Sequence, residues 1–165
     1  TVALQACLPV LELGIDHYDG FVGIVMHGAA VVAAREVMDE DGIVHAYDEE
    51  LAGEAMEGGP LMLSWADVLP AEDGDAPATA YNVVIHEFAH YLDHESGGAP
   101  WIAGTGARRR WLRLLDQELE RLRAQADAGA RSFLDPYAAE DRGEFFAVAS
   151  EAFFEEPATF VRALT

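Results

Sequence analysis

His86-Glu87-Phe88-Ala89-His90 is the most informative segment of the sequence, an H-E-x-x-H pentapeptide that directly follows the apolar run Tyr81–Ile85. Residues four apart lie nearly above one another on an α-helix, so His86 and His90 are expected to project from one face. Two imidazoles in that arrangement can bind a single Zn²⁺. Glu87 lies roughly 100° further around the helix, where it can reach a water molecule beside the metal. The pattern predicts two ligands and the general base of a site for metal-assisted hydrolysis.

A structural role for the two histidines is the alternative, in which both are buried and satisfied by hydrogen bonds. A mostly apolar helix at the centre of a small domain would suit either role. The apolar positions of this helix are Val83, Val84, Ile85, Phe88, Ala89 and Leu92. The spacing of the histidines, with a glutamate beside the first, favours the metal site.

The composition indicates one domain without nucleic-acid or membrane partners. The 165 residues, 51% of them hydrophobic, are expected to form a single domain over residues 1–165 with a substantial core. The formal net charge of −20 comes from 30 acidic and 10 basic residues. Such a charge repels nucleic acids and anionic membranes at long range, so we expect neither as a partner.

A single cysteine and the lack of a targeting segment favour the cytoplasm. Cys7 lies in an apolar run and is expected to be a small core residue. A chain that cannot form an internal disulfide fits a reducing compartment. No basic segment opens the sequence, and no apolar stretch is long enough to span a bilayer. We therefore expect a cytoplasmic protein.

The residues before the motif are expected to form a helix and a small antiparallel or mixed sheet. The helix is predicted over residues 2–13, with Pro9 as a kink or break. An Asp-Gly turn at Asp39–Gly42 predicts a hairpin, and residues 66–80 are predicted to be an irregular loop. The expected strands are Phe21–Met26, Val31–Ala34, Glu36–Met38, Ile43–Tyr47 and Leu61–Trp65. The last of them could be an edge strand that an extended peptide joins, or an ordinary interior strand.

The second half of the sequence is predicted to be helical. The motif helix is expected from about Asn82 to about Asp93. A long amphipathic helix over residues 106–126 follows, and then a loop over residues 127–141. Two last helices are predicted at Glu144–Phe154 and Ala158–Leu164. The predicted fold class is therefore α+β, with a small sheet before the motif helix.

The third ligand does not follow from the two best-known zinc patterns. A catalytic zinc keeps three protein ligands and one open position. The metzincin pattern would require a third histidine where Ser96 stands, so it is excluded. Thermolysin-like enzymes take a glutamate from the next helix. Glu118 and Glu120 are in range, but they lie in a charged segment without the usual surrounding residues.

Acidic residues of the last helical segment are the remaining candidates. Glu144, Glu151 and Glu155 are spaced by seven and four residues, so they share one helix face. Glu144 begins the apolar stretch Phe145–Ala149, where an unpaired carboxylate would be costly to bury. That cost favours Glu144, but the residues alone leave all three open.

Several blocks, in order and over nearly the whole chain, resemble the Mlc titration factor A (MtfA) family of zinc peptidases. These blocks are Gln5–Pro9, Ile43–His45, Leu63–Val68, His86–Asp93 and Glu144–Pro157. Members of this family are similar in their catalytic core to the anthrax lethal factor protease domain. They usually carry a further helical region before the core, and we expect this sequence, which begins inside the first block, to lack it.

The resemblance implies a zincin-like fold with a gluzincin-like site, in which a helix after the motif helix carries a glutamate ligand. That ligand would be Glu144, in the Glu-Phe-Phe-Ala block, which joins His86 and His90 around one Zn²⁺. Glu87 would be the general base. Tyr137, seven residues before Glu144, would donate a hydrogen bond to the oxyanion. The alternative for Tyr137 is a loop tyrosine packed on the surface.

The resemblance also implies an aminopeptidase-like activity on peptide substrates and, in some members, binding to the Mlc repressor. The first hypothesis is a zinc metallopeptidase that hydrolyses peptide bonds with a zinc-activated water. The second is a regulatory binding protein that sequesters a transcriptional repressor, with a mainly structural metal site. A metallohydrolase acting on a non-peptide amide is a third hypothesis.

Asp93 and His94, at the end of the predicted motif helix, lie close enough to the histidines to have roles in the same site. Asp93 falls on the histidine face about one turn beyond His90. It could accept a hydrogen bond from the outer nitrogen of a ligand imidazole, or simply be a helix-end carboxylate. His94 stands four residues after His90 but close to Gly97-Gly98, and we expect it to be solvated.

Overall fold

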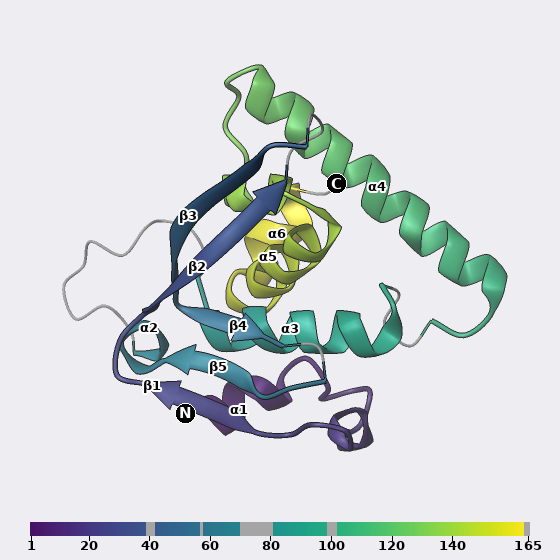
Figure 1. The fold of residues 1–165 in the computed structure, drawn as a ribbon. Helices are drawn as coiled ribbons and strands as arrows, with labels where there is room; N and C mark the ends of the chain where they lie inside the picture. Colours follow the sequence, from purple (N-terminus) through teal and green to yellow (C-terminus); the bar gives the residue numbers. More distant parts are fainter. Residues whose placement is uncertain (39–41, 57, 70–80, 99–101, 164–165) are drawn as a thin grey trace.

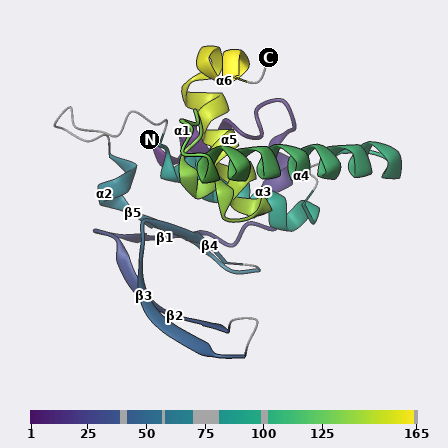
Figure 2. The ribbon, with the colours of Figure 1, turned by 90° about the horizontal axis from the view of Figure 1, so that it is seen from above.

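The computed structural model describes residues 1–38, 42–56, 58–69, 81–98 and 102–163. It confirms the α+β class, with two small sheets and a mainly helical second half. In Figure 2 the helices lie on one side of the larger sheet, and a two-stranded hairpin extends from its other side. Residues 39–41 of the turn predicted at Asp39–Gly42, and most of the loop predicted over 66–80, fall outside the described residues.

The larger sheet is mixed and has the strand order β1-β5-β4. β1 (Ile24–His27) is parallel to β5 (Leu61–Ser64), and β4 (Gly53–Ala55) is antiparallel to β5. All four β5 residues are buried, as expected for an apolar strand with neighbours on both edges. Of the two alternatives for Leu61–Trp65, the structure shows the interior strand, because β1 and β4 flank β5 and β4 forms the edge.

The hairpin consists of β2 (Val31–Met38) and β3 (Val44–Leu51), which pair from Val31 opposite Leu51 to Met38 opposite Val44. The two strands predicted at Val31–Ala34 and Glu36–Met38 are one continuous strand. Most of the hairpin side chains are exposed. Figure 1 shows β3 leading toward β4, so the hairpin stands at the edge of the sheet that β4 forms.

Two helices of the first half differ from the sequence prediction. α1 (Val2–Cys7) ends before Pro9, so the helix predicted over residues 2–13 is too long. Cys7 is exposed, which corrects the expectation of a core residue. α2 (Trp65–Val68) occupies the start of the segment predicted to be an irregular loop. A 3-10 helix, η1 (Ile15–Tyr18), lies between α1 and β1.

The motif helix, α3 (Val83–Ser96), has a defined start and end. The Asn82 side chain accepts a hydrogen bond from the Ile85 N–H at 3.1 Å and caps the first turn. Gly97 ends the helix with φ 62°, a left-handed conformation that favours glycine. Most of α3 is buried, because it packs against β5 on one side and against a later helix on the other.

The remaining helices follow the predicted order. α4 (Thr105–Asp127) is the long amphipathic helix, and the 3-10 helix η2 (Pro136–Ala139) lies in the predicted loop. α5 (Arg142–Glu155) and α6 (Pro157–Ala163) end the described chain. Figure 1 shows α5 beside α3, with α4 crossing the molecule above them. No helix in the described part of the chain is long and apolar enough to cross a membrane.

Two clusters of buried side chains hold α3 and α5 in place. The first joins α1, α2, α3 and β5 through Ala6, Leu61, Leu63, Val68, Val83, Val84 and Phe88. The second joins α4, η2 and α5 through Leu115, Leu119, Leu122, Ala138, Phe145 and Val148. The functional side chains lie where α3 and α5 meet between these clusters.

Candidate metal centre

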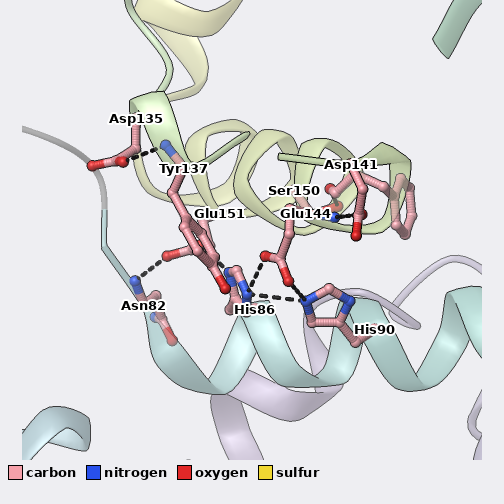
Figure 3. A network of polar contacts seen from close by, with 10 residues as sticks. Asn82, His86, His90, Asp135, Tyr137, Asp141, Glu144, Ser150 and Glu151 are labelled. Atoms are coloured by element: carbon pink, nitrogen blue, oxygen red, sulfur yellow. Dashed lines mark hydrogen bonds and ion pairs between the residues drawn. The ribbon is translucent and has the colours of Figure 1, made fainter. Parts of the chain in front are cut away.

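Three potential ligands converge from two helices. The Nε2 atoms of His86 and His90 on α3 lie 3.1 Å apart. Glu144, from the first turn of α5, places one carboxylate oxygen 3.2 Å from His86 Nε2 and the other 3.3 Å from His90 Nε2 (Figure 3). The ligand atoms all lie within 4.8 Å of one another. This arrangement could hold a metal ion.

The local sequence explains why these atoms meet. Four residues separate the histidines, so one helical turn aligns them on α3. Asp141 caps α5 by accepting a hydrogen bond from the Glu144 N–H at 3.0 Å. This cap fixes the first turn of α5 and with it the position of the Glu144 side chain. The sequence prediction named these three residues, and the structure brings all of them together.

The polar atoms fit a cation. Glu144 Oε2 is buried and forms no hydrogen bond with any described residue, although it lies near His86. The two imidazole nitrogens face each other with the carboxylate beside both, so at most one proton can lie between the rings. A cation bound by all three side chains would satisfy these atoms together. Two nitrogen ligands and one carboxylate oxygen suit Zn²⁺.

The acidic neighbours of His86 favour the charged form of its ring. Burial disfavours the imidazolium, but the neighbouring carboxylates of Glu144 and Glu151 outweigh it and raise the pKa of His86 to about 10. For Glu144, burial raises the pKa, but the two imidazoles outweigh it and lower the value to about 2. The site therefore favours positive charge between these groups.

Glu87 projects from α3 toward β4 and lines both cavities described below. Only 5% of its surface is exposed. Burial raises the pKa of Glu87 to about 7, against the opposing influence of the His86 and His90 imidazoles. A carboxyl group that titrates near neutrality can both accept and return a proton.

Tyr137 lies in η2 and faces the same site. Its backbone N–H donates to the Asp135 carboxylate at 2.9 Å, which fixes the turn. The Tyr137 ring lies 6.2 Å from the His86 ring, centroid to centroid. Burial and then the carboxylates of Glu144 and Glu140 raise the pKa of its phenol. The hydroxyl therefore stays protonated and can donate a hydrogen bond into the cleft.

Two adjoining cavities of about 290 and 340 Å³ meet at His86, Glu87 and Tyr137. The walls are β3 and β4 on one side and α3, η2 and α5 on the other. The smaller cavity continues along Tyr81, Val83, Val148 and Glu151, and the larger one along Arg35, Glu54, His90, His94, Asp141 and Glu144. Together they form a cleft whose lining carries more acidic than basic side chains.

Arg35 connects the hairpin to the edge of the sheet. From β2, its guanidinium donates to Glu49 of β3 and to Glu54 of β4, each at 2.8 Å. The two ion pairs hold the hairpin against β4 beside the metal centre. Sequence reasoning missed both Arg35 and β4, because the Gly-Glu-Ala of β4 carries no β-branched run.

Glu151 contacts His86 from outside the ligand set. Its side chain, 2% exposed, places Oε1 2.6 Å from His86 Nδ1 and accepts a hydrogen bond from the Asn82 N–H at 2.6 Å. The sequence predicted Glu151 as a candidate ligand, and not as a partner of His86 Nδ1. The sequence feature that could have indicated this contact is the separation of Glu151 from Glu144 by seven residues, or two helical turns, which places both on one helix face.

Asp93 and His94 lie further along α3. No hydrogen bond among the described residues joins the Asp93 carboxylate to a histidine ring, so its role as an outer acceptor stays a prediction. Burial raises the pKa of Asp93, while the nearby His94 and His90 rings oppose the rise. His94 is exposed and lines the larger cavity.

The chain is similar to one protein family and to several relatives that share a name. The family described as glucose-regulated metallo-peptidase M90 matches residues 1–165. Mlc titration factor A of Salmonella agona (strain SL483) is 36% identical over 165 residues, which cover 96% of this chain and 60% of that protein. The proteins of the same name from Cronobacter sakazakii and Escherichia fergusonii are each 37% identical over 165 residues, which again cover 96% of this chain and 60% of the relative. The chain thus spans about 60% of the length of these relatives. The predicted resemblance to the Mlc titration factor A family is confirmed.

Proposed function

The chain belongs to the glucose-regulated metallo-peptidase M90 family, and from this premise we propose that it is a zinc-dependent, aminopeptidase-like peptidase with a zincin-like core. The observation that carries the proposal is the convergence of His86, His90 and Glu144, with the buried Glu87 beside them. The three side chains would hold one Zn²⁺. When bound, the ion would polarise the scissile carbonyl and lower the pKa of a water molecule.

The chain's own groups supply the proton transfers and part of the oxyanion stabilisation. Glu87 would take a proton from the attacking water and pass it to the leaving amine. Its pKa of about 7 supports both transfers. The Tyr137 hydroxyl, which stays protonated, would donate a hydrogen bond to the oxyanion.

The edge of β4 that no described strand pairs with supports a peptide substrate. β4 pairs with β5 on one side, and its residues Gly53, Glu54 and Ala55 line the larger cavity. An extended peptide could pair with this edge and lie across the site. The acidic lining, which includes Glu50 and Asp135, would favour a substrate with a free amine terminus.

A regulatory function is the second candidate, because the relatives carry the name Mlc titration factor A. In that case the chain would bind a transcriptional repressor, and the metal site would mainly stabilise the fold. Glu87→Gln separates the two functions, since it removes the base but keeps the shape of the side chain and all three ligands.

The test compares wild type with E87Q on short peptides that carry either a free or an acetylated amine. We expect zinc-dependent hydrolysis of the free peptides by wild type, a loss of roughly 10²–10⁴ in rate for E87Q, and unchanged zinc binding. Full hydrolysis by E87Q would contradict the proposed role of Glu87. Equal cleavage of acetylated peptides would contradict the aminopeptidase-like preference. Hydrolysis by neither protein, with repressor binding by both, would favour the regulatory function.

A further inference from the structure

Glu151 is a buried carboxylate that the proposed mechanism does not use. We infer that Glu151 is a positioning residue, which orients the His86 ring and so sets the affinity of the site for its metal. This inference rests on the proposed metal site. Helix α5 would then contribute two residues to the site, the ligand Glu144 and the residue Glu151 that orients the ligand His86.

The two carboxylates approach His86 from opposite sides of its ring. Glu144 lies near Nε2, and Glu151 Oε1 lies 2.6 Å from Nδ1. A hydrogen bond from Nδ1–H to Glu151 leaves the lone pair on Nε2. That atom faces His90 Nε2 at 3.1 Å, where the metal would lie. The contact therefore selects the imidazole form that a metal requires.

Helix geometry explains how one helix reaches both sides. Seven residues of α5, about 10.5 Å of helix rise, separate Glu144 from Glu151. Glu144 contacts His90 and His86, whereas Glu151 contacts His86 and the preceding Asn82. α5 therefore runs antiparallel to α3, as Figure 3 shows, and the two carboxylates bracket His86 along the helix.

The surroundings of Glu151 hold its carboxylate between Asn82 and His86. Its second oxygen accepts from the Asn82 N–H at the start of α3, also at 2.6 Å. No arginine forms an ion pair with Glu151 among the described residues, and the His86 ring is the side chain in contact with Glu151 Oε1. A buried carboxylate is stable only when its charge is compensated. The buried Glu151 carboxylate therefore depends on its two partners, the Asn82 N–H and His86 Nδ1, and this contact holds the His86 ring in one orientation.

Glu155 provides a matched control one turn further along α5. Its carboxylate accepts a hydrogen bond from Asn82 Nδ2 at 2.6 Å. Glu155 thus ties α5 to the same end of α3 but does not contact His86. A merely structural role for Glu151 would make its loss resemble the loss of Glu155.

The experiment measures zinc affinity by competition with a chromophoric chelator for wild type, E151Q, E151A and E155Q. We expect zinc to bind E151Q roughly 10–100-fold more weakly than wild type, E151A more weakly still, and E155Q within about twofold of wild type. In zinc-loaded protein, the His86 Nδ1–H proton should give a protected NMR signal in wild type and E155Q that is lost in E151A. If E151A does not fold, the zinc affinity of E151Q decides the test.

Wild-type affinity in E151Q would overturn the inference, as would equal losses in E151Q and E155Q. In either case zinc binding by wild type would leave the proposed metal site standing. A wild-type protein that binds no zinc would overturn the proposed function and the inference together.

Discussion

Glu87 packs directly against the backbone of Gly53. A Cβ atom at Gly53 would lie 2.5 Å from Glu87 Cγ and 2.7 Å from Cδ, closer than any real contact permits. Only 5% of Glu87 is exposed, so its side chain has little room to move aside. The edge strand β4 therefore determines where the proposed general base lies, and a glycine at this position makes that placement possible.

Gly53→Ala should therefore displace the Glu87 carboxylate without touching the ligands. We expect kcat/KM for peptide hydrolysis to fall about 100-fold, because a displacement of about 1 Å in a catalytic group has that effect. Zinc affinity should be unchanged. Gly28→Ala is the matched control, since a Cβ at Gly28 would meet no atom within 4 Å. Full activity in G53A would show that the contact does not position Glu87.

Tyr137→Phe tests the proposed oxyanion donor. Loss of the hydroxyl should lower kcat by roughly 10²–10³ while KM and zinc affinity stay close to wild type. Tyr81→Phe is the control, because Tyr81 lines the smaller cavity but is not assigned a role in the reaction. Steady-state kinetics on the same peptide would measure both. Equal rates for wild type and Y137F would favour the surface-tyrosine alternative.

Zinc binding should release a proton at neutral pH. The pKa of His86 in the metal-free protein is about 10, so this ring is charged at pH 7, whereas a metal ligand must be neutral. Zinc affinity should therefore rise about tenfold for each unit of pH between 7 and 9.

The same raised pKa of His86 also affects the stability of the protein without zinc. The imidazolium stabilises the fold at neutral pH, and this stabilisation is lost as the pH rises past about 10.

Calorimetry in two buffers with different ionisation enthalpies would count the released protons. His94→Gln is the control, because His94 is exposed beside the cleft and belongs to no ligand set. A binding enthalpy that is independent of the buffer would contradict the prediction.

Asn82→Ala should destabilise the fold through the start of α3. Its side chain caps Ile85 N–H at 3.1 Å and donates to Glu155 at 2.6 Å. We expect the free energy of unfolding to fall by about 1–2 kcal/mol, mostly from the lost cap. Glu155→Ala loses only the second contact and should cost less. Chemical denaturation would measure both, and equal losses would show that the cap contributes little.

Local pattern made the central part of the site predictable. The four-residue spacing of His86 and His90 fixes their geometry on a helix whatever the rest of the chain does. Glu144 was only one of three candidates by spacing and burial, and the family resemblance chose among them. The structure brings it to the histidines because α5 packs against α3, a long-range contact that no local pattern contains.

The features that the sequence did not predict depend on contacts between segments that are distant in the chain. β4 is a strand only because Gly53–Ala55 pairs with β5, and its three residues have no strand signal of their own. The sequence left open whether β5 is an edge or an interior strand, and pairing with β1 and β4 makes it interior. The contact of Glu151 with His86 depends in turn on the antiparallel packing of α3 and α5.

Anomalous diffraction across the zinc edge, on crystals of the zinc-loaded protein, tests the central claim most directly. The account predicts one peak within bonding distance of His86 Nε2, His90 Nε2 and a Glu144 oxygen, with Glu151 retained on His86 Nδ1. No peak between these three side chains, or a metal bound by Glu151 in place of Glu144, would contradict it.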